Sequence, residues 1–75
     1  MQRIIEFVEN VINENNKCCN AVVCGGDFQN EIIIKFKKKD GKEKERYKKT
    51  IEKALEYGAI IKKTCPATLE TTLKF

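Results

Sequence analysis

The fold of this chain depends on residues 31–58, which read EIIIKFKKKDGKEKERYKKTIEKALEYG. The first seven of these residues alternate apolar and charged side chains, except that Ile33 breaks the pattern. A period of two predicts a strand over residues 31–37. The remainder carries charged faces around an apolar stripe at helical spacing, formed by Tyr47, Ile51, Ala54 and Leu55. Asp40 followed by Glu43 predicts a capping box, and Gly58 predicts the end of the helix.

Four further elements flank this stretch. Residues 1–16 carry an apolar stripe typical of an amphipathic helix, with Asn15 and Asn16 as a stop. Residues 18–24 are predicted to form a short strand, and Gly25-Gly26-Asp27 predicts the turn that pairs it with 31–37 as a hairpin. Residues 59–63 and 69–75 are predicted as two more strands, joined at Cys65-Pro66. The helical stripe of residues 1–16 consists of Ile4, Ile5, Val8, Val11 and Ile12.

The predicted order of elements is α-β-β-α-β-β, and 75 residues suffice for one domain spanning 1–75. Moving the last strand to the front gives β-α-β-β-α-β, the ferredoxin-like order. The chain therefore predicts an α+β two-layer sandwich that fits a circularly permuted ferredoxin-like fold. Two helices would cover one face of a four-stranded sheet. Strands 31–37 and 69–75 would be central, and strands 18–24 and 59–63 would be the edges.

Positive charge gathers between Lys35 and Lys53, where ten basic and four acidic residues give +6, against +4 for the whole chain. The end of the central strand and the start of the second helix should share one end of the domain, together with Lys17 and Lys74. Such a patch suits phosphates, and its lysine-rich composition predicts non-specific nucleic-acid binding without base reading. A solvated hairpin that keeps a small protein soluble is the alternative interpretation. The predicted contact residues are Lys35, Lys37, Lys38, Lys39, Lys42, Lys44, Arg46, Lys48 and Lys49.

A second candidate surface is the sheet face that no helix covers. Ile33 should point to this face. One of Ile60 and Ile61, and one of Ala21–Val22 and Val23, should join it, and we take Ile61 and Val23 as the interface residues. An uncovered apolar face indicates an interface, here for a homodimer or a protein partner. A viral or mobile-element protein that occludes a host protein would fit this size and composition by analogy. Scattered surface isoleucines without a role are the alternative.

The four cysteines do not have the paired spacing of structural zinc sites. We expect Cys24 and Cys65 at the same end of opposite edge strands, about 14 Å apart, with Cys18 and Cys19 at the other end. A disulfide between Cys24 and Cys65 would then be too long. Reduced thiols are the expected state, with a disulfide or zinc as the open alternatives.

Catalysis is not expected, because the chain has no histidine and no serine to form the common nucleophile–base pairs. We therefore predict no catalytic residues, no cofactor and no metal site. The amino terminus does not resemble a signal peptide, and no apolar run reaches the length of a membrane span. The sequence predicts a small, non-catalytic binding module in the cytoplasm.

Overall fold

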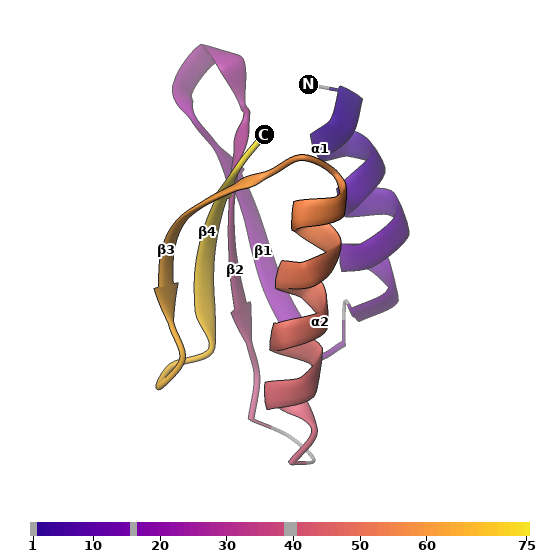
Figure 1. The fold of residues 1–75 in the computed structure, drawn as a ribbon, viewed down its shortest axis with the longest axis vertical. Helices are drawn as coiled ribbons and strands as arrows, with labels where there is room; N and C mark the ends of the chain where they lie inside the picture. Colours follow the sequence, from indigo (N-terminus) through magenta and orange to yellow (C-terminus); the bar gives the residue numbers. More distant parts are fainter. Residues whose placement is uncertain (1, 16, 39–40) are drawn as a thin grey trace.

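The computed structural model of the chain describes residues 2–15, 17–38 and 41–75. Two helical segments lie on one face of a four-stranded antiparallel sheet, and the predicted order α-β-β-α-β-β is confirmed (Figure 1). Within these ranges, no helix is both long and apolar enough to cross a bilayer. The elements are α1 (Gln2–Phe7), η1 (Val8–Ile12), η2 (Asn13–Asn15), β1 (Cys19–Cys24), η3 (Gly26–Phe28), β2 (Glu31–Phe36), α2 (Glu43–Glu56), β3 (Ile60–Cys65) and β4 (Glu70–Lys74).

The sheet has the strand order β1-β2-β4-β3, so β2 and β4 are central and β1 and β3 are the edges. This is the order expected for the permuted arrangement. Ile32 and Ile34 of β2 lie opposite Leu73 and Thr71 of β4, and all four are buried beneath the helices. Each fully buried isoleucine or leucine contributes roughly 1.5–3 kcal/mol by leaving water. The central pair of strands therefore carries much of the core.

The first helical segment runs without a break from Gln2 to Asn15, but it changes pitch from α-helix through one π-helical segment to a 3₁₀ turn. Its buried side includes Phe7, whose ring lies 5.2 Å from Phe75 and 5.8 Å from Tyr57 between centroids. Ile5, expected in the core, is exposed. The reason is that the segment also packs on α2, where Arg3 Nη1 donates to the Tyr57 carbonyl at 2.8 Å. This second contact turns the buried face toward Phe7 and away from Ile5.

The second helix, α2, starts later than predicted. Its N-cap is Lys42, without a side-chain capping hydrogen bond, so the capping box expected at Asp40 and Glu43 is wrong. Asp40 itself lies outside the described residues. At the other end Gly58 has φ 84°, and the N–H groups of Gly58 and Ala59 donate to the carbonyls of Leu55 and Ala54. These two bonds form a Schellman motif, which confirms the predicted stop.

One face of α2 also differs from the prediction. Leu55 was expected in the core but is exposed, whereas Thr50 is buried. Thr50 faces the groove between α2 and the first helical segment, beside Val11. Because α2 packs on a helix as well as on the sheet, its buried face is displaced toward Thr50.

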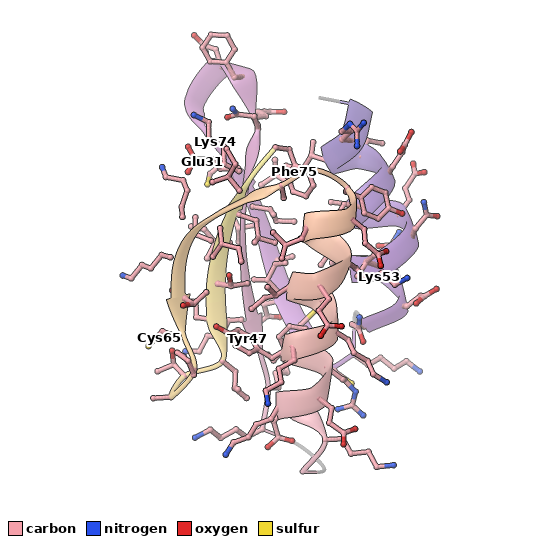
Figure 2. The ribbon with its side chains drawn as sticks, viewed as in Figure 1. Glu31, Tyr47, Lys53, Cys65, Lys74 and Phe75 are labelled. Carbon is pink, nitrogen blue, oxygen red and sulfur yellow. The ribbon has the colours of Figure 1, made fainter. Side chains whose placement is uncertain are left out.

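The direction of β3 shows that two expectations about which residues share an end of the sheet are wrong. The α2 helix carries the chain away from the end of β2, and β3 returns, so Cys65 lies near that end (Figure 1). Cys65 pairs with Glu70, whereas Cys24 pairs with Glu31 at the opposite end of the sheet. The expectation that Cys24 and Cys65 share an end is therefore wrong. Figure 2 shows Lys74 beside Glu31, far from Cys65, so the expectation for Lys74 is also wrong.

Candidate nucleic-acid interface

Positive side chains surround the end of the domain where β2 finishes and α2 begins. Lys37 and Lys38 directly follow β2, and the Lys37 N–H donates to the Cys18 carbonyl at 2.7 Å. Lys42 precedes α2, and four further basic residues lie on its first two turns. Lys39, also predicted as a contact, lies outside the described residues. We call the described set the lysine end: Lys35, Lys37, Lys38, Lys42, Lys44, Arg46, Lys48 and Lys49.

Two shallow hollows at the lysine end are lined by lysines. The first, of about 380 Å³, has three lysines together with Asn20 and Thr68. The second, also of about 380 Å³, has Lys44 and Lys48. Ala67 lines both, so the hollows lie on either side of the turn between β3 and β4. Among the described residues, no carboxylate lines either hollow; the three lysines of the first are Lys35, Lys37 and Lys38.

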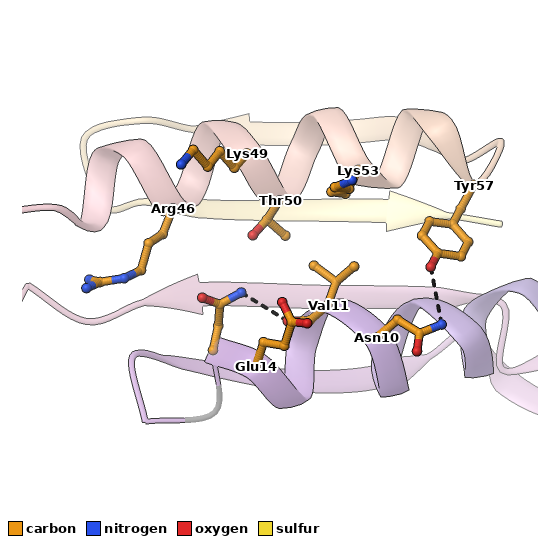
Figure 3. A pocket seen from close by; sticks show the side chains of 9 residues that line it. Asn10, Val11, Glu14, Arg46, Lys49, Thr50, Lys53 and Tyr57 are labelled. Atoms are coloured by element: carbon orange, nitrogen blue, oxygen red, sulfur yellow. Dashed lines mark hydrogen bonds between the residues drawn. The ribbon is translucent and has the colours of Figure 1, made fainter.

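A third hollow, of about 430 Å³, runs between α2 and the first helical segment (Figure 3). Arg46, Lys49 and Lys53 line it from α2. Asn10 closes one end by donating from Nδ2 to the Tyr57 hydroxyl at 3.3 Å. Glu14 of the facing segment also lines this groove, so its charge is mixed. The groove therefore suits an anion less well than the two hollows beside the turn.

The arrangement of α2 adds to the positive field. Its N-terminus points to the lysine end, where the helix macrodipole contributes a partial positive charge. Lys42 and Lys44 oppose this dipole, a placement that costs stability rather than adding it. Glu43 and Glu45 in the first turn offset part of the cost. The lysine end thus combines side-chain charge with the backbone dipole.

Three residues of these hollows were not predicted from the sequence. Asn20 lies opposite Lys35 in the β1–β2 register, so correct pairing of the hairpin would have identified it. Thr68 belongs to the turn after β3, whose position depends on the direction of that strand. Lys53 lies one turn beyond the predicted basic cluster, on the same side of α2 as Arg46 and Lys49.

The uncovered sheet face has a different composition from the one predicted. Ile33 is on it and is 36% exposed. However, Val23 pairs with Ile32, and Ile61 pairs with Leu73, so both point to the helix side, and their expected place beside Ile33 is wrong. Opposed residues in neighbouring antiparallel strands point to the same side of the sheet.

The residues that replace them are Val22, opposite Ile33, and Ile60, opposite Lys74. Val22 and Ile33 are neighbours across β1 and β2. Ile60, on β3, is separated from β1 by the charged residues Lys74 of β4 and Glu31 of β2. Glu31 also accepts from Lys62 Nζ at 3.0 Å across the sheet. The face is therefore mixed, with one small apolar patch at Val22 and Ile33.

The four cysteines are free. Within the described ranges, no group of three or more histidine, cysteine, aspartate or glutamate side chains could hold a metal. Burial raises the pKa of the Cys19 thiol. Hydrogen bonds from the side chain and backbone of Thr68 lower the pKa of the Cys65 thiol. These two thiols should therefore differ most in reactivity.

Comparison of the chain with models of protein families, with curated proteins and with solved structures found no match.

Proposed function

We propose that the protein is a small, non-catalytic module that binds nucleic acid through the lysine end. The observation that carries the proposal is the pair of hollows beside the β3–β4 turn, lined by five lysines and no described carboxylate. Phosphate contacts in such complexes come from lysine and arginine and from polar side chains such as those of threonine and asparagine. Thr68 and Asn20 supply polar groups of this kind in the first hollow. A nucleic-acid ligand also agrees with the cytoplasmic location expected from the sequence.

Binding of nucleic acid at the lysine end would not depend on the base sequence of the ligand. A lysine ammonium is a flexible point charge and does not read bases as the arginine fork does. Phe36 and Tyr47 are buried and pack edge-to-face on each other, with ring centroids 6.3 Å apart. Neither ring is therefore offered as a stacking platform for bases. The contacts that remain are to the phosphate backbone.

A titration of fluorescent single-stranded and duplex oligonucleotides, followed by anisotropy, tests the proposal. Five phosphate contacts predict a log–log slope against salt of roughly −3.5 to −4.5, so affinity should fall about 100- to 500-fold between 50 and 200 mM salt. Unrelated sequences should bind alike. Absence of binding at low salt, or binding that does not respond to salt, would contradict the proposal.

A protein-interaction module, for example an inhibitor of a host protein, is the second candidate. Its support is the exposed apolar patch at Val22 and Ile33, together with Phe28, which is 73% exposed in the β1–β2 loop. Ile33→Asp should abolish such an association while the protein keeps its circular dichroism spectrum. An association that survives both Ile33→Asp and Phe28→Ala would rule out this use of the two surfaces.

A further inference from the structure

The turn between β3 and β4, residues 66–69, forms a ridge between the two hollows of the lysine end. Ala67, in the middle of this turn, lines both hollows. Pro66, Ala67 and Thr68 are exposed, and their side chains are short and uncharged. The lysines of the two hollows therefore lie on either side of a ridge that itself carries no charge.

The two hollows belong to different faces of the sheet. Lys35 follows the buried Ile34 and pairs with Asn20, so Lys35 and Asn20 line the first hollow from the uncovered face. Lys44 and Lys48 line the second hollow from α2, which lies on the covered face (Figure 1). A ligand that fills both hollows must therefore approach the ridge from two sides.

Hydrogen bonds hold the ends of this turn against both of its neighbours. The Phe36 N–H donates to the Leu69 carbonyl at 3.0 Å, which ties the turn to the end of β2. The Tyr47 hydroxyl donates to the Glu70 carbonyl at 3.0 Å, which ties the start of β4 to α2. Leu69 is also buried in the core. The ridge and its two hollows are therefore preorganised, which lowers the entropic cost of binding a ligand.

A single strand fits this surface poorly, because proteins that bind single strands combine positive charge with aromatic rings on which bases stack. Within the described ranges, the rings at the lysine end are those of Phe36 and Tyr47, and both are buried. The exposed ring of Phe28 lies in the β1–β2 loop, at the opposite end of the sheet (Figure 1). A duplex needs no stacking platform, and it presents one negative charge per about 1.7 Å of its axis, twice the density of one strand.

We infer that the nucleic acid bound at the lysine end is a duplex and that the β3–β4 turn enters one of its grooves. This inference rests on the proposed function and names the form of the ligand. Each of the two backbones that border the groove would lie in one hollow. The major groove of B-form DNA is about 12 Å wide and admits a two-stranded β-ribbon, which is what β3 and β4 form next to the turn. One backbone would then meet Lys35, Lys37 and Lys38, and the other would meet Lys44 and Lys48.

Fluorescence anisotropy at low salt tests the inference by comparing a short DNA duplex with each of its separated strands. The wild-type protein should bind the duplex at least tenfold more tightly, with a log–log salt slope of about −4.5 for five phosphate contacts. Separated strands that bind as tightly as the duplex, or more tightly, would overturn the inference and leave the proposed function standing. Absence of binding to either form would overturn the proposed function as well.

A substitution on the ridge gives a second readout. Ala67→Trp makes the ridge bulkier, so it should weaken duplex binding at least tenfold, but it offers single strands a ring for stacking, so their binding should not weaken. The control Ile60→Trp places the same ring at an exposed position of β3, at the other end of the sheet, and should leave both affinities unchanged. Circular dichroism checks that both variants fold. Wild-type duplex affinity in Ala67→Trp, or an equal loss of duplex and single-strand binding, would overturn the insertion of the turn into a groove.

Discussion

Ile33 and Ile34 are adjacent in the sequence but contribute to different parts of the molecule. Ile34 is fully buried between the sheet and the helices, whereas Ile33 remains partly exposed on the uncovered face. Burial of an isoleucine excludes water from its whole side chain, and its removal leaves a cavity. The alternation of β2 therefore separates a residue that stabilises the core from one that faces outward.

Truncating the two isoleucines should have very different effects. Ile34→Ala should lower the free energy of unfolding by about 2–5 kcal/mol, the usual cost of emptying a core position. Ile33→Ala should cost roughly 1 kcal/mol or less, as expected for a side chain still in contact with water. Urea denaturation followed by circular dichroism measures both, with Ile33→Ala as the control. Equal losses of unfolding free energy in Ile34→Ala and Ile33→Ala would show that Ile33 and the uncovered face are buried in solution.

The cysteines should differ in reactivity because their environments shift their pKa values in opposite directions. The pKa of Cys65 is lowered by hydrogen bonds from Thr68, so more of it is thiolate at neutral pH. The pKa of Cys19 is raised by burial, so it should react slowest. The alkylation rate of each cysteine can be measured as a function of pH by mass spectrometry. The pH at which the rate is half-maximal should be lowest for Cys65. Thr68→Val should raise that midpoint, and an unchanged Cys65 rate in this variant would contradict the explanation.

At the scale of elements, the end of α2 depends on one backbone conformation. Gly58 has φ 84°, a left-handed conformation that is unfavourable for residues with a Cβ atom. A Cβ built at Gly58 would lie 3.5 Å from Arg3 Nη1, which is an ordinary contact. The cost of a substitution there therefore comes from the backbone and not from a clash.

Gly58→Ala should accordingly destabilise the protein by about 1–2 kcal/mol. Gly58→Asn should cost less, because asparagine adopts the left-handed conformation more readily. Thermal unfolding of the two variants and the wild type checks this order. A Gly58→Ala protein as stable as the wild type would mean that the helix does not end in the Schellman motif.

The kind and order of the elements could be predicted from the sequence, but not their register. A period of two identified strands 31–37 and 69–75, a period of 3.6 identified the two helices, and short apolar runs identified the other two strands. The isoleucine-rich β2 was correctly placed at the centre. The placement of Val22 rather than Val23 beside Ile33 depends on how the loop between β1 and β2 closes. Gly25, Gly26 and Gln29 all have positive φ in that loop, and no propensity predicts such a path. The register shift in β3 likewise has no signal in its apolar pattern.

At the scale of the whole molecule, the direction of each strand decides which charges share an end. The lysine end was predicted because Lys37, Lys38 and the start of α2 are close in sequence. Thr68 reaches the same end only because β3 returns from the end of α2. The misplacement of Lys74 and Cys65 has the same origin, since local patterns do not record strand direction. Proximity within the chain predicted the five lysines of the two hollows, and topology supplied Asn20 and Thr68.

Neutralising lysines at matched positions gives the most direct test of the proposed function. The triple variant Lys37→Gln, Lys38→Gln and Lys48→Gln removes three charges from the two hollows. The control variant Lys62→Gln, Lys63→Gln and Lys74→Gln removes the same charge from β3 and β4, outside both hollows. The two variants have the same net charge as each other, so a difference in their affinity for oligonucleotides reports the position of the removed charges alone.

The measurement is oligonucleotide affinity by anisotropy as a function of salt. The lysine-end variant should bind at least tenfold more weakly at low salt than the wild type, with a salt slope shallower by roughly 2–3. The control should keep most of the wild-type affinity and slope. Equal losses in the two variants, or wild-type affinity in the lysine-end variant, would contradict the assignment of nucleic-acid binding to this end of the domain.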